Sequence, residues 1–181
     1  LGAPAVAGDL AFSAGIAEIF RMVNSTEASS TAQSAVNLTF LRLDKEIRYA
    51  ASISTPGPVS GDVSGNTTYA EYLTTSSGTA ICTELRLQNS TGLLQRRVWT
   101  QSAPPASIPW VPLAAGVTAA TSFTLVPPDS TSNYQRLGLK IVIGAGSGTT
   151  LATREYDATF TAVNTSVTSS STDCTEGRSI P

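Results

Sequence analysis

The stretch that decides the fold is VNLTFLRLDKEIRYAASISTPGP, residues 36–58. Apolar residues recur in it at a 4-3-4-3 spacing, which places them on one side of a helix. They are Val36, Phe40, Leu43, Ile47 and Ala50. Leu38 and Leu41 are expected to widen this apolar stripe. The Pro-Gly-Pro sequence at 56–58 ends the helix, because proline cannot continue it.

Helical spacing continues upstream of this stretch. Ile16, Phe20 and Val23 follow it as well, and no proline lies between Pro4 and Pro56. We therefore expect one long N-terminal helix, from about Leu10 to Ile53. Its second half would pack on the rest of the domain through Val36, Phe40, Leu43 and Ile47. Its first half would project beyond the domain, so Ile16, Phe20 and Val23 are expected to contact partner helices.

The chain after the prolines has the pattern of antiparallel strands. Residues 81–88 alternate between apolar and polar, and NSTG at 89–92 predicts a turn into a partner strand at 93–101. Further strands are expected at 69–74, 121–126, 137–143 and 154–163. The sequence thus predicts an α+β fold, with the long helix packed on an antiparallel sheet of four to six strands. Residues 1–55 form the helical segment, and 56–181 form the sheet domain with a Ser/Thr-rich, structurally weak tail beyond Asn164.

The composition indicates an exported protein. Charged residues make up 13% of the chain, against about 25% in typical soluble domains, and Ser and Thr take their place. The net charge is −2, so the chain lacks the basic excess that nucleic-acid binding needs. We therefore expect the cell surface, the periplasm or the extracellular space, and no nucleic-acid partner.

The absence of histidine argues against an enzyme. The chain has no His, which removes the usual general base, the commonest neutral metal ligand and the Ser–His and Cys–His nucleophile pairs. No pair of carboxylates and no glycine-rich loop has the spacing of a known site. We expect no catalytic, cofactor-binding or metal-binding residue.

Two cysteines lie 92 residues apart, at Cys82 and Cys174. An even count in an exported chain favours a disulfide, here one that ties the tail to the body. The alternative is two free thiols in a cytosolic protein, which the composition disfavours. Trp99 and Trp110 are more typical of packing than of ligand binding. Trp110 lies in a proline-rich loop and is the better candidate for a surface contact.

Four segments resemble type IV pilin-like proteins, in particular minor pilins and the minor pseudopilins of type II secretion. LTFLRLDKEIRYAASISTPGP at 38–58 is similar to the end of their N-terminal helix. CTELRLQNSTGLLQRRVWT at 82–100 is similar to their first hairpin, and WVPLAAGV at 110–117 to the loop after it. YDATFTAVN at 156–164 looks like their last strand. The shared order of these segments carries the likeness.

The resemblance implies a structural subunit of a type IV pilus or a type II secretion-like filament. Its partners would be other pilin-like subunits, and the inner membrane through a segment upstream of Leu1. A second hypothesis is a secreted, β-rich binding module that carries glycans. Five of the six asparagines stand in Asn-x-Ser/Thr sequons. They are Asn24, Asn37, Asn66, Asn89 and Asn164.

Overall fold

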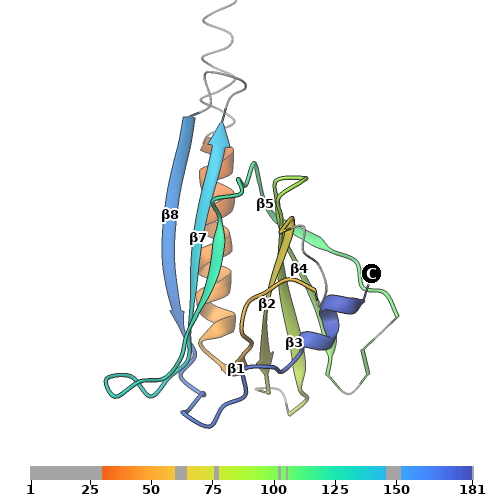
Figure 1. Ribbon diagram of the computed structural model, residues 1–181, viewed down its shortest axis with the longest axis vertical. Helices are drawn as coiled ribbons and strands as arrows, with labels where there is room; N and C mark the ends of the chain where they lie inside the picture. Colours follow the sequence, from red (N-terminus) through yellow and green to blue (C-terminus); the bar gives the residue numbers. More distant parts are fainter. Residues whose placement is uncertain are drawn as a thin grey trace, which may run out of the picture.

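The computed structural model describes residues 30–59, 65–75, 78–101, 103–104, 106–145 and 152–180. In these ranges the chain forms one α-helix at residues 30–47, eight strands in two antiparallel sheets and a short 3₁₀ helix near the C-terminus (Figure 1). The five-stranded sheet has the order β1 (Ala50–Ile53), β2 (Thr67–Thr74), β3 (Ile81–Gln88), β4 (Leu93–Thr100) and β5 (Val111–Ala115). The three-stranded sheet has the order β6 (Ser122–Val126), β7 (Arg136–Ala145) and β8 (Ala152–Thr161).

This architecture shows that the expected fold class is wrong. The prediction was a long N-terminal helix packed on one antiparallel sheet, whereas the described chain is mostly β, with a short helix and two sheets. The strands after residue 120 form a sheet of their own, and Ile143 of β7 also makes an isolated antiparallel bridge with Val117, just after β5. Local alternation predicts that a segment is a strand but does not say which strand it pairs with.

The helix is buried along one side between the two sheets. Val36, Leu43 and Ile47 are fully buried, and Phe40 is half-buried with its ring edge-on to Phe160 of β8 at 5.9 Å. The same apolar cluster contains side chains of both sheets, such as Leu85 of β3 and those of Leu139 and Ile141 of β7. Figure 1 shows the helix lying between the β7–β8 pair and the five-stranded sheet.

The helix is also shorter than expected at its C-terminal end. It ends at residue 47, and Ala50–Ile53 is the edge strand β1 instead of a further helical turn. The backbone of β1 pairs with β2, with Ile53 opposite Tyr72. The Ile53 amide also donates a hydrogen bond to Oε1 of Gln135, at 2.8 Å. Tertiary pairing therefore outweighs the helical spacing of the apolar residues over this segment.

The opposite side of the helix faces solvent. Leu38 and Leu41, which were expected to widen the buried stripe, have 67% and 71% of their surface exposed. The buried face is therefore narrower than the sequence indicated, and two large apolar side chains remain uncovered. No helix in the described ranges is both long enough and apolar enough to span a membrane.

The C-terminal tail is ordered against the sheet, contrary to the expectation of a structurally weak segment. The amide of Thr55 donates to the Ser171 carbonyl at 2.8 Å, and the short 3₁₀ helix η2 (Thr175–Ser179) follows. Cys82 and Cys174 form a disulfide, with their Cα atoms 5.6 Å apart. The predicted covalent link between tail and body is thus present.

Candidate functional site

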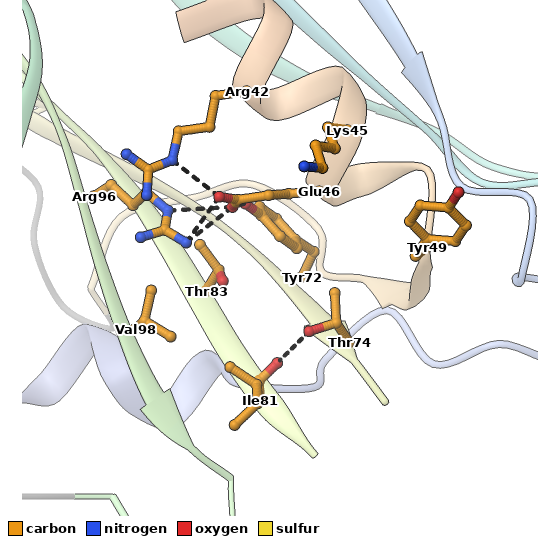
Figure 2. A pocket seen from close by; sticks show the side chains of 10 residues that line it. All are labelled: Arg42, Lys45, Glu46, Tyr49, Tyr72, Thr74, Ile81, Thr83, Arg96 and Val98. Carbon is orange, nitrogen blue, oxygen red and sulfur yellow. Dashed lines mark hydrogen bonds and ion pairs between the residues drawn. The ribbon is translucent and has the colours of Figure 1, made fainter. Parts of the chain in front are cut away.

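A pocket of about 470 Å³ opens between the last turns of the helix and the helix-facing side of the five-stranded sheet (Figure 2). Neighbouring strands line its floor, because Tyr72, Thr83 and Val98 stand opposite one another on β2, β3 and β4. The helix and the turn after it form the rim. The lining residues are Arg42, Lys45, Glu46, Tyr49, Tyr72, Thr74, Ile81, Thr83, Arg96 and Val98.

The Glu46 carboxylate is the centre of the polar contacts in this pocket. Arg96 of β4 contacts both carboxylate oxygens through Nη2, at 3.1 and 2.9 Å, and contacts Oε2 through Nε at 3.2 Å. Arg42, one helical turn earlier, donates from Nε to Oε1 at 2.9 Å. The Tyr72 hydroxyl donates to Oε2 at 2.5 Å. One carboxylate thus joins the helix to β2 and β4.

These contacts keep Glu46 ionised and Tyr72 neutral. Partial burial raises the pKa of Glu46, but the hydrogen bonds from Tyr72, Arg42 and Arg96 outweigh it, so the pKa lies below its ordinary value. Burial, together with the neighbouring Glu46 charge, raises the pKa of the Tyr72 phenol. Glu46 is therefore a fixed anion surrounded by donors, which suits anchoring better than proton transfer.

The pocket has more positive than negative groups. Arg42, Lys45 and Arg96 line the pocket together with the single carboxylate of Glu46, which leaves a surplus of two positive charges. Lys45 is exposed and has no ion-pair partner within the part of the chain that the structure describes. Chemically, the pocket can bind an anion through guanidinium and ammonium donors, but it has no nucleophile with an activating base.

A second group of charged residues lies under the tail, on the other side of the same sheet. Glu84 of β3 and Arg97 of β4 form an ion pair with both side chains fully buried. The neighbouring Glu71 of β2 binds Arg178 of η2, with Nε–Oε1 2.6 Å and Nη2–Oε2 2.7 Å. Arg97 also donates to the carbonyl of Gly177. Two arginines therefore hold the tail to two adjacent carboxylates.

Burial is the main influence on the ionisation of these two carboxyl groups. It raises the pKa of Glu84 to about 7, although the hydrogen bond and charge of Arg97 act in the opposite direction. Burial also raises the pKa of Glu71, with Arg178 opposing it. A raised carboxyl pKa is typical of acid–base sites, but neither Glu71 nor Glu84 reaches solvent. We interpret the group as structural.

Trp110 is packed rather than freely exposed. The Cζ atoms of Arg86 and Arg97 lie 3.9 and 4.1 Å from the centroid of its ring, and the Tyr69 ring lies at 6.3 Å. Two guanidinium groups therefore already contact the ring by cation–π interaction. This geometry favours the packing interpretation of Trp110 over the surface-contact interpretation.

The remaining predicted residues divide by location. Val36, Phe40, Leu43 and Ile47 lie together in the apolar cluster on the buried side of the helix. The proposed partner-contact residues Ile16, Phe20 and Val23 lie outside the described residues. Glu176 approaches the two cysteines closely enough for a metal site, but both sulfurs belong to the disulfide and are not free to bind metal.

Sequence reasoning missed the pocket. The i,i+4 pair of Arg42 and Glu46 is visible in the sequence, but Arg96 lies 50 residues from Glu46 and Tyr72 lies 26 residues away. The available signal was Glu46 on the side of the helix that carries the apolar stripe, where a charged group needs partners.

Comparison with known proteins gives no relative. No known protein family matches the chain. Curated proteins and solved structures give no significant match either.

Proposed function

We propose that the chain is an exported structural subunit that joins other pilin-like subunits through its N-terminal helix, in a type IV pilus or a type II secretion-like filament. The two-sheet domain would be the outward part of the subunit. The four segments with a pilin-like pattern support this proposal, as does the disulfide, which is typical of exported proteins.

The observation that carries the proposal is the uncovered apolar surface of the helix. Large apolar side chains are exposed at Leu38, Leu41 and Tyr49, in the helix or in the turn that ends it. These are three of the seven exposed large hydrophobic residues among those described. Exposed apolar groups gathered on one element are typical of a contact surface. We call Leu38, Leu41 and Tyr49 the outer helix surface.

Paired substitutions test assembly. Leu38→Asp with Leu41→Asp, and separately Ile16→Asp with Phe20→Asp, should abolish incorporation of the full-length protein into its assembly. Val167→Asp is the matched control, because Val167 is 70% exposed and lies in the tail, away from the helix. Normal incorporation of both double variants, with fold and disulfide intact, would contradict the proposal.

One observation favours the second candidate, a secreted glycosylated module. Asn37 has an exposed side chain on the helix, so its sequon is accessible, and Asn66 and Asn164 are exposed too. The intact mass of the protein from its native host, before and after treatment with an endoglycosidase, decides this point. Glycans on Asn37 would cover the outer helix surface and would favour the module over the assembly subunit.

A further inference from the structure

The charge of the pocket near Glu46 differs from that of the whole molecule. The chain has a net charge of −2, yet three cationic side chains and one carboxylate line this pocket. In the described part of the chain, Glu46 is the only acidic group at the pocket, and Arg96, Arg42 and Tyr72 already bind it. The positive charge of the lining therefore exceeds what Glu46 neutralises.

Several donors remain available to a second anion. Arg42 contacts Glu46 through Nε alone, so its two terminal nitrogens are not used by that contact. Lys45 also lines the pocket, drawn on the other side of Glu46 from the Arg42 guanidinium in Figure 2, and has no ion-pair partner among the described residues. Guanidinium and ammonium groups are the donors that bind carboxylates most strongly. The opening thus suits one carboxylate.

The apolar part of the lining favours a carboxylate that has apolar groups on either side of it. Ile81 and Val98 line the floor, and Tyr49 lies at both the rim and the outer helix surface, with 52% of its surface exposed. The volume of about 470 Å³ lies within the range of about 300–1,000 Å³ for ligand pockets. A free inorganic anion would leave the apolar lining unused, whereas an acidic side chain between apolar residues would contact both parts.

The chain itself contains such a segment. Glu18 lies in SAGIAEIFRMVN at 13–24, between Ile16 and Ala17 on one side and Ile19 and Phe20 on the other. We propose that the pocket near Glu46 receives the Glu18 carboxylate of a neighbouring copy, with Arg42 and Lys45 as its donors. This inference rests on the proposed function, because it names the partner group that the outer helix surface brings to the pocket.

The distribution of lysines allows a direct test by carbodiimide coupling. The chain has two lysines, Lys45 and Lys140, and Lys140 lies away from the pocket in an ion pair with Glu155. The probe is the peptide of residues 13–24, acetylated and amidated, so that Glu18 is its only carboxyl group. Coupling joins the Glu18 carboxyl carbon to a lysine nitrogen with loss of water to the carbodiimide. Mass mapping on the full chain then locates the new amide bond.

We expect the peptide to couple to Lys45 about fivefold or more in preference to Lys140, as a gain of about 1 kcal/mol in local binding would give. A peptide of the same composition with Ser13 and Glu18 exchanged should lose this preference. Arg42→Gln in the protein should lower it as well, and this exposed position should leave the fold intact.

The other outcomes separate the pocket inference from the proposed function. Equal coupling to both lysines, or a preference that the rearranged peptide keeps, would show that the pocket does not select this segment. An assembly that is lost in Leu38→Asp with Leu41→Asp but intact in Glu18→Gln would keep the proposed function and overturn the pocket inference. Selective coupling to Lys45 in a protein that never assembles would keep the pocket's preference for this segment and overturn the proposed function.

Discussion

Arg96 of β4 holds Glu46 of the helix with Nη2 2.9 Å from Oε2, and so joins two elements that are 50 residues apart in the chain. Only 15% of the Arg96 side chain and 25% of the Glu46 side chain are exposed. The pair therefore lies partly out of water, where a hydrogen bond to a charged group contributes more than at the surface. It fixes the C-terminal end of the helix on the five-stranded sheet.

Arg96→Gln should lower the free energy of unfolding by about 2 kcal/mol, because a charge-assisted pair is lost while Glu46 stays half-buried. Urea denaturation measures this change. Arg48→Gln is the matched control, since Arg48 binds Asp44 in an exposed pair that contributes little. Equal losses in both variants would show that the Arg96–Glu46 pair has no special role.

Replacing both Cys82 and Cys174 with serine should destabilise the protein by about 4.6 kcal/mol. The disulfide closes a loop with a sequence separation of 92 residues, and the chain-entropy relation gives this magnitude for a loop of that size. Denaturation of the parent with and without reductant gives an independent value. A loss below about 1 kcal/mol would indicate that the contacts of Arg97 and Arg178 hold the tail without the covalent link.

The contribution of Glu84 to the free energy of unfolding should fall as the pH rises from about 4.5 to about 7. Burial raises its pKa in the folded protein from 4.5 to about 7, so in this range the folded state holds more protons than the unfolded chain does. Stability then falls with increasing pH. Glu84→Gln should flatten this part of the profile, even if the neutral side chain lowers stability overall by leaving buried Arg97 without its carboxylate. Unfolding free energies of both proteins across this range provide the measurement. An unchanged slope would contradict the assignment.

Gly177→Ala should loosen the tail. A Cβ atom at this position would collide with the indole ring of Trp99 and would lie 3.1 Å from Oε1 of Glu84. Overpacking of this kind lowers stability by about 1–3 kcal/mol. Gly138→Ala is the control, because its Cβ would meet Thr124 at an ordinary distance of 3.5 Å. Limited proteolysis after residue 164 should be faster in Gly177→Ala alone.

The sequence predicted the hairpin of β3 and β4 well, since both strands alternate and the NSTG segment ends in Gly92, whose φ of 62° suits a turn. It missed β1, because helical spacing and the pattern of an edge strand overlap at Ala50–Ile53. It missed β5, because Pro112 in a proline-rich stretch indicates a loop, although proline is compatible with an edge strand.

The tail and the pocket could not be predicted for a different reason. The tail is ordered by distant partners: for example, the hydroxyl of Ser52 in β1 donates to Oδ2 of Asp173 in the tail, at 2.5 Å. The pocket depends on the packing of the helix against β2 and β4, which no local pattern reveals. The prediction of a disulfide between Cys82 and Cys174 succeeded because two cysteines allow only one pairing.

The most direct test compares how accessible the outer helix surface is in the free subunit and in the assembly. A thiol introduced by Leu38→Cys should react with a maleimide in the free subunit. On assembly, the rate of this reaction should fall by about tenfold or more, because neighbouring subunits cover the thiol. A thiol introduced by Val167→Cys should react at the same rate in both states, because the tail faces solvent there. Equal reactivity at position 38 in the two states would contradict assembly through the helix.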